Sequence, residues 1–96
     1  MAVVLVVQAP GITQEQYEAS VKTISTRGTL ESPSDWPVEG LLAHIAGEGP
    51  NGFRVVDVWE SEDALRRFGE KLIPVLAELG VDAQPEIYPA HTFVSA

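Results

Sequence analysis

The strands that this sequence predicts are apolar on both faces. Residues 2–8 read AVVLVVQ, with aliphatic side chains at odd and even positions alike. An antiparallel sheet with one face in water normally alternates apolar and polar residues. Both faces of this sheet therefore need cover, and a chain of 96 residues has few elements to provide it.

Six main elements follow one another along the chain. Strands are predicted over 2–8, 40–47, 53–60 and 86–94, and helices over 13–26 and 62–79. A capping box, Thr13-x-x-Gln16, opens the first helix, and Ser61 caps the second. Gly80 ends the second helix as its C′ residue, whereas Pro74 predicts a kink or a new segment within it.

The order βαββαβ predicts one ferredoxin-like α+β domain over residues 1–96. Two right-handed crossovers joined by a hairpin give a four-stranded antiparallel sheet with both helices on one face. The strands 2–8 and 53–60 take its centre, and Pro89 places 86–94 at an edge. Residues 28–39 show no periodicity and predict a loop, either a functional lid or a mobile segment, which Trp36 anchors.

The hairpin register decides which side chains share a face. If Gly47 pairs with Gly52, His44 faces Val55, and Asp57 lies one cross-strand step along on the same face. The opposite face is almost wholly aliphatic, and we expect it under the helices; it carries Leu41, Ala43, Ile45, Val56 and Val58.

The face of His44 predicts a homodimer. It holds Leu42, Phe53, Val55 and Trp59, which is too much apolar surface to leave in water. Two sheets that meet by this face about a two-fold axis would bury it and enclose a cavity. A tail or loop that covers the face within a monomer is the alternative.

Charge and composition exclude several classes of partner. The net charge of −8 and only six basic residues argue against nucleic acid and anionic membranes as partners. The absence of cysteine excludes disulfides and thiolate metal sites. The apolar N-terminal run lacks a basic region before it and is too short to span a membrane, so we expect a cytoplasmic protein.

The hairpin GLLAHIAG-EGPN-GFRVVDVWES and the helix with Phe68…Leu72-x-Pro74 resemble the dimeric α/β-barrel superfamily. This ferredoxin-like group includes antibiotic-biosynthesis monooxygenases, haem-degrading oxygenases and polyketide cyclases. The resemblance implies a small-molecule site between the sheet and the helices of each subunit. Haem degradation is not expected, because Gly69 stands where that branch has its helix histidine, although Trp59 matches its tryptophan.

Two titratable residues in apolar strands are the candidate catalytic pair. His44 is a general base or acid, and Asp57 orients its ring. The alternatives are a histidine satisfied by a buried hydrogen bond and an aspartate paired with an arginine or a turn. Two histidines and one aspartate with no metal-ligand spacing do not predict a metal site.

Aromatic residues supply the candidate substrate contacts, and His91 has the parity to join them. These residues are Trp59, Tyr88, His91, Phe53 and Phe68. Together with the resemblance, they predict a monooxygenase-, isomerase- or cyclase-like enzyme that needs no metal or organic cofactor and takes an aromatic or polyketide-like substrate. The rival prediction is a non-catalytic ligand-binding or interaction protein of the same fold.

Overall fold

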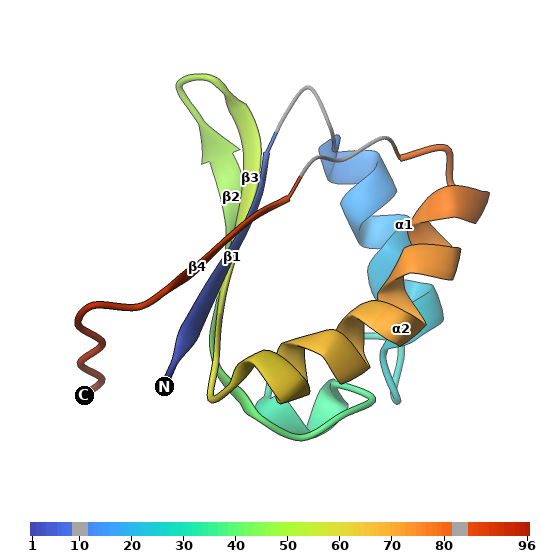
Figure 1. Ribbon diagram of the computed structural model, residues 1–96. Helices are drawn as coiled ribbons and strands as arrows, with labels where there is room; N and C mark the ends of the chain where they lie inside the picture. Colours follow the sequence, from blue (N-terminus) through green and yellow to red (C-terminus); the bar gives the residue numbers. More distant parts are fainter. Residues whose placement is uncertain (9–11, 82–84) are drawn as a thin grey trace.

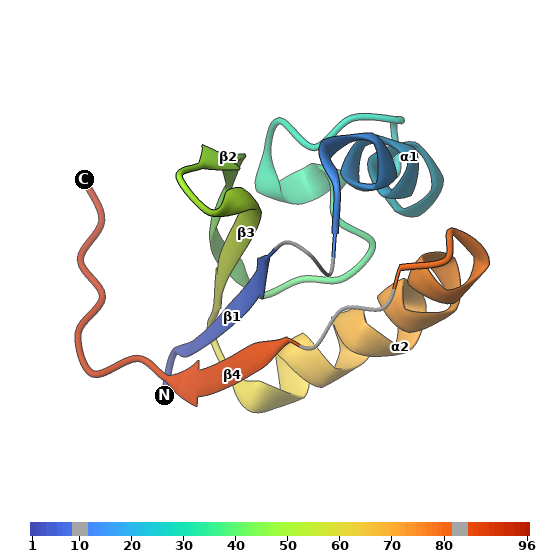
Figure 2. The ribbon, with the colours of Figure 1, turned by 90° about the horizontal axis from the view of Figure 1, so that it is seen from above.

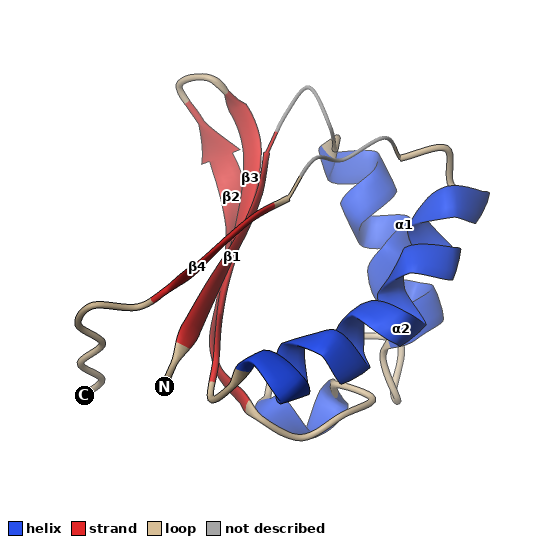
Figure 3. Ribbon diagram, in the orientation of Figure 1, coloured by secondary structure: helices blue, strands red, loops and turns tan. Residues whose placement is uncertain are grey.

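The computed structural model describes residues 1–8, 12–81 and 85–96. Four strands and two helices form two layers, with a sheet on one side and both helices on the other (Figures 1 and 3). The elements are β1 (Val3–Gln8), α1 (Gln14–Ile24), a short 3-10 helix (Pro33–Asp35), β2 (Leu41–Gly49), β3 (Gly52–Trp59), α2 (Glu62–Glu78) and β4 (Glu86–Pro89). The predicted βαββαβ order and ferredoxin-like fold are confirmed.

The sheet has the strand order β2-β3-β1-β4 and is antiparallel throughout. The predicted central strands, β1 and β3, are confirmed, and β4 lies at an edge. The strand predicted over 86–94 ends at Pro89, and the chain beyond runs on without regular structure on the side of the sheet away from the helices (Figure 1).

Local signals in the sequence set the ends of both helices. Thr13 and Gln16 form the predicted capping box, with Gln16 N donating to Thr13 Oγ1 over 3.1 Å and Thr13 N to Gln16 Oε1 over 3.0 Å. Ser61 caps α2 by accepting from Ala64 N. Gly80, at φ +73°, ends α2 in a Schellman motif, in which Val81 N donates to Leu76 O.

Pro74 does not divide α2. The helix runs without interruption from Glu62 to Glu78, so the predicted second segment does not occur. Pro74 is exposed on α2, and Glu70, four residues before it, is exposed as well. The backbone hydrogen bond that proline removes can therefore be replaced by water.

The hairpin register differs from the prediction by two residues. Gly49 pairs with Gly52 across a two-residue turn, so His44 lies directly opposite Asp57, and not opposite Val55. The prediction assumed a longer turn. A shift of two residues keeps His44 and Asp57 on one face. The prediction for Leu41 is wrong, because a register irregularity between Leu41 and Ala43 pairs Leu41 with Trp59, and Leu41 therefore packs against the core and not on the aliphatic face.

The prediction of which face lies under the helices is wrong. The helices cover the face of His44 and Asp57, where Val3, Leu5 and Val7 of β1 complete the buried layer. The aliphatic face is the open one, and on it Ile45 is 66% exposed. The reason lies in the side chains that pack on this face. Aromatic rings from α1, the loop and α2 contact the histidine and the tryptophan that the face carries.

The two helices lie over different halves of the sheet. Figure 2 shows α1 and the 3-10 segment on the side of β2 and β3, and α2 on the side of β1 and β4. Of the helices in the described part of the chain, none is both long enough and apolar enough to span a membrane.

Candidate functional site

His44 and Asp57 form a buried pair under the helices. His44 Nδ1 lies 2.5 Å from Asp57 Oδ1, and the side chains are 13% and 4% exposed. The pair forms because the register places the two residues directly opposite each other, where side chains on one face are closest. A carboxylate between aliphatic neighbours is thereby satisfied by a hydrogen bond.

Tyr17 of α1 extends this pair to three residues. Its Oη lies 2.7 Å from His44 Nε2, and its ring stacks on the imidazole with centroids 5.9 Å apart. With a neutral imidazole, Nδ1–H donates to Asp57 and Nε2 accepts the Tyr17 hydroxyl. Burial raises the pKa of the Tyr17 hydroxyl above its ordinary value, and the charge of Asp57 raises it further.

Trp59 provides the second donor to Asp57. Its Nε1 donates to Asp57 Oδ2 over 3.3 Å, and its fully buried ring stacks on Phe68 of α2 at a centroid distance of 4.9 Å. Tyr17, His44, Asp57 and Trp59 thus make a continuous hydrogen-bonded chain, which we call the relay. Nucleophile–base–carboxylate systems in enzymes use the same order of a hydroxyl, an imidazole and a carboxylate.

Trp36 closes the relay from the loop side. Its ring meets the His44 imidazole edge-on, with centroids 4.9 Å apart. The predicted anchoring role of Trp36 is confirmed, since the side chain is buried in the core. The loop over 28–39, predicted without regular structure, contains one short 3-10 helix.

An ion pair between the exposed Arg27 side chain and the buried Asp35 carboxylate holds this loop in place. Arg27 Nε and Nη2 donate to the two carboxylate oxygens of Asp35 over 2.5 and 3.0 Å. Asp35 also accepts from the backbone N–H groups of Glu31 and Ser32. The Arg27 guanidinium and these N–H groups hold the pKa of the Asp35 carboxyl well below its usual range. Asp35 directly precedes Trp36, and so the ion pair positions the ring against His44.

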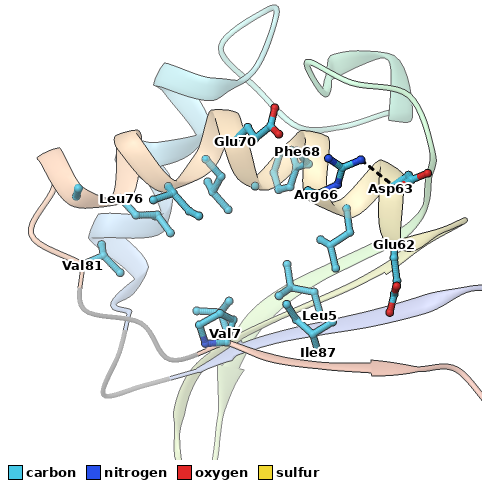
Figure 4. A pocket seen from close by; sticks show the side chains of 16 residues that line it. Leu5, Val7, Glu62, Asp63, Arg66, Phe68, Glu70, Leu76, Val81 and Ile87 are labelled. Atoms are coloured by element: carbon cyan, nitrogen blue, oxygen red, sulfur yellow. Dashed lines mark hydrogen bonds and ion pairs between the residues drawn. The ribbon is translucent and has the colours of Figure 1, made fainter.

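A cleft of about 740 Å³ lies between α2 and the β1–β4 half of the sheet. Figure 4 shows α2 above, with Leu5, Val7 and Ile87 rising from the strands below. The interior is apolar and the polar side chains belong to the first half of α2. The lining residues are Leu5, Val7, Glu62, Asp63, Leu65, Arg66, Phe68, Gly69, Glu70, Leu72, Ile73, Leu76, Ala77, Val81, Pro85 and Ile87.

One layer of side chains separates the cleft from the relay. Leu5 lines the cleft and lies directly opposite Asp57 in the β1–β3 register. Phe68 lines the cleft and stacks on Trp59. Tyr17, His44 and Asp57 themselves do not line it. Neighbouring strands are about 4.8 Å apart, so the carboxylate is one side chain away from the cleft.

The structure distributes the predicted substrate contacts over three places. Phe68 lines the cleft. Trp59 and Phe53 are buried on the relay side, where Phe53 packs on Tyr17 at 5.3 Å between centroids. Tyr88 lies on the open face and is 46% exposed, because it pairs with Val4 in the register. His91 follows β4 and is exposed, so neither it nor Tyr88 faces His44.

Sequence reasoning missed Tyr17, the cleft and the Arg27–Asp35 pair. Tyr17 forms an apolar stripe with Val21 and Ile24 along the first helix, and its phenolic hydroxyl, on a stripe otherwise aliphatic, was the available signal. The cleft depends on how far α2 stands from the sheet, which no residue pattern reports. Over residues 1–8, 12–81 and 85–96, no three His, Asp or Glu side chains gather as metal ligands.

The comparisons place the fold among known structures. No protein-family model matches the chain, and no curated protein matches it. A conserved protein from Methanosarcina mazei superposes with a TM-score of 0.57 at 20% identity, over 93% of this chain and 92% of the other. An antibiotic biosynthesis monooxygenase, described as putative, from Deinococcus radiodurans gives 0.57 at 16% identity, over 100% and 98%.

SnoaB, a cofactor-independent oxygenase from Streptomyces nogalater, gives a TM-score of 0.56 at 14% identity, over 99% of this chain and 95% of SnoaB. At these identities the likeness establishes the fold and leaves the reaction open. The chain thus shares its ferredoxin-like fold with these three proteins.

Proposed function

We propose that this protein is a small-molecule enzyme that takes a flat, largely apolar aromatic or polyketide-like substrate into the α2 cleft and oxidises it without a cofactor. The observation that carries the proposal is the open apolar cleft between helix and sheet. Ligand sites are concave, apolar and commonly 300–1,000 Å³ in volume, and about 740 Å³ fits three fused rings. SnoaB, with the same fold, is described as a cofactor-independent oxygenase.

The proton chemistry falls to the relay. A phenol or anthrone that loses a proton becomes an electron-rich anion, which is the form that reacts with O₂. In the proposed reaction an anthrone and O₂ give the quinone and water. Tyr17 gives its hydroxyl proton to His44 Nε2 and takes up the substrate's proton in its place, while Asp57 holds Nδ1–H and stabilises the imidazolium. Because Leu5 and Phe68 separate substrate and relay, this layer has to open during the reaction.

A test uses O₂ uptake with anthrone and 1-naphthol as trial substrates. The proposal expects uptake by the wild-type protein and a loss of at least a hundredfold in His44→Gln, with binding of the substrate retained. Lys71→Ala, on the exposed side of α2 and outside the cleft, is the matched control and keeps full uptake. Equal uptake by His44→Gln and wild type would remove the role of His44.

A non-catalytic ligand-binding protein is the second candidate, and one observation favours it. His44 is enclosed by Tyr17, Trp36 and Asp57, and does not line the cleft. On this reading the relay is a satisfied polar core that stabilises the fold. The protein would then bind anthrone saturably with no O₂ uptake, in wild type and in His44→Gln alike.

We also propose that two copies associate through the open sheet face. The face first expected at the interface is covered by helices, which leaves the aliphatic face for a partner. It carries Val4, Ala43, Ile45, Val56 and Val58, and a continuous apolar patch on a small protein is typical of an interface.

The oligomeric state tests this interface. Sedimentation should give a particle of twice the 10.4 kDa chain mass. Ile45→Glu places a charge in the patch and should give the single chain, whereas Lys71→Glu, on α2, should sediment like the wild type. A wild-type protein that sediments as one chain at micromolar concentration contradicts the proposal.

A further inference from the structure

A glycine stands at the centre of the cleft-facing side of α2. Residues three and four positions away on a helix lie on the same side of it. Leu65, Arg66, Leu72 and Ile73 are four and three positions before, and three and four positions after, Gly69, and all of them line the cleft. The missing side chain of Gly69 would therefore point into the cleft.

The fold itself gives no reason for a glycine at this position. Positive φ angles occur at Gly28, Gly40, Gly52 and Gly80, but not at Gly69. A Cβ built on Gly69 meets no described atom within 4 Å. By contrast, a Cβ on Gly40 would lie 2.6 Å from Ala64 Cβ. Glycine inside a helix also lowers its stability relative to alanine. The chain thus gives up helix stability to keep space that no described protein atom fills.

We propose that Gly69 is the specificity-determining position of the cleft, where a flat ring lies directly against the backbone of α2. Phe68 and Ile73 lie on either side of the space next to Gly69 along the helix. Leu5 and Ile87 form the opposite wall of the cleft. The ligand class that fits is a fused aromatic system, thin enough to enter between helix and sheet. This inference rests on the proposed function, because it takes the cleft as the substrate site.

The test compares binding with stability in Gly69→Ala. The probe is Nile red, an uncharged fused-ring fluorophore, titrated into the wild-type protein and followed by its emission. We expect about tenfold weaker binding in Gly69→Ala, because a methyl group forced into a fitted contact weakens it, and near-complete loss in Gly69→Leu. The Tm of Gly69→Ala should rise by about 4 °C, because alanine favours the helix.

Thr23→Ala is the matched control. Thr23 is exposed on α1, away from the cleft, and its replacement also raises helix propensity. It should raise the Tm without a change in Nile red affinity. A second variant, Ile87→Trp, fills the cleft from β4 and should weaken binding as Gly69→Leu does, which locates the probe.

The outcomes separate this inference from the proposed function. Saturable binding by the wild type with unchanged affinity in Gly69→Ala and Gly69→Leu would overturn the role of Gly69 and leave the cleft as the site. A lower Tm in Gly69→Ala would also overturn it, since glycine would then be required by the fold. Absence of saturable wild-type binding would overturn the proposed function, and this inference with it.

Discussion

The two halves of one sheet face are built in opposite ways. Under α1, the β2–β3 half is closed, and its polar atoms are joined in the relay from Tyr17 to Trp59. Under α2, the β1–β4 half is open and apolar, and on it Ile87 is 54% exposed although it faces the helix layer. The difference follows from the cover: the loop over 28–39 adds Trp36 to the first half, and the described chain adds no such side chain to the second.

This contrast separates stability from binding. In the closed half the polar side chains of the relay are hydrogen-bonded to one another, so a substitution there changes the free energy of unfolding. In the open half, apolar surface remains exposed to solvent. A ligand that covers this surface gains a binding free energy of about 25 cal/mol for each Å² buried. A protein that used the whole face for its core would have no cleft.

The largest effect on the free energy of unfolding should come from Trp36→Ala, which removes the side chain that closes the β2–β3 half. Removal of a buried tryptophan leaves a cavity beside His44 and should lower the free energy of unfolding by about 4 kcal/mol. Urea denaturation followed by circular dichroism measures the change. Trp36→Phe retains a ring and should recover at least half of the loss. A cost below about 1 kcal/mol in Trp36→Ala would mean that the loop does not close this half.

Asp57→Asn should lower the free energy of unfolding by about 2 kcal/mol. Asp57 accepts from both His44 Nδ1 and Trp59 Nε1, whereas an asparagine has one acceptor oxygen, so one buried donor loses its partner. Urea denaturation gives the stability, and ¹⁵N chemical shifts of the His44 ring report its tautomer. Retention of the wild-type tautomer together with unchanged stability would show that Asp57 does not orient the imidazole.

Tyr17→Phe should cost about 1 kcal/mol, because His44 Nε2 loses its hydrogen bond. The pKa of Tyr17 is raised in the folded protein. Between the pKa of the unfolded chain and the higher pKa of the folded state, the folded protein keeps this proton and the unfolded chain has lost it. The contribution of Tyr17 to the free energy of unfolding is therefore full below about pH 10 and is lost as the pH rises through the folded pKa.

Phenolate absorbance at 295 nm checks the titration of Tyr17. The chain has two tyrosines, and Tyr17→Phe leaves Tyr88 alone. The phenol that disappears in this variant should be the one that titrates above its ordinary pKa. If the missing phenol titrates at or below the ordinary value, Tyr17 is not buried against the relay.

Most of the fold could be predicted from the periodicity of apolar residues and from the residues that cap helices and form turns. Thr13, Ser61 and Gly80 mark helix ends by hydrogen bonds made within a few residues, so local sequence suffices to find them. The side-chain parity of the hairpin from Ala43 to Val58 was also predictable, since any shift of two residues preserves it, whereas the irregularity that moves Leu41 leaves no local signal. This is why the sequence predicts His44 and Asp57 on one face although the predicted register is wrong.

What could not be predicted depends on contacts between distant elements. Which face the helices cover was decided by the aromatic rings of Tyr17, Trp36 and Phe68, which come from three separate elements. Counting aliphatic residues on the strands favoured the wrong face. The predicted substrate contacts are separated for the same reason. Phe68 lines the cleft, whereas Tyr88 has the side-chain parity of the open sheet face.

The smallest effect on stability should come from Ile87→Ala, in the open half. Ile87 is more than half exposed, so its truncation should cost less than about 1 kcal/mol, whereas Val55→Ala in the closed half, at 9% exposure, should cost about 2 kcal/mol. Both residues are β-branched and lie in strands on the helix-covered face, which makes them a matched pair. Nile red affinity should change in the reverse order, because Ile87 lines the cleft and Val55 does not. Equal costs in urea denaturation for the two variants would mean that the cleft is closed in solution, and the two halves of the face would then be packed alike.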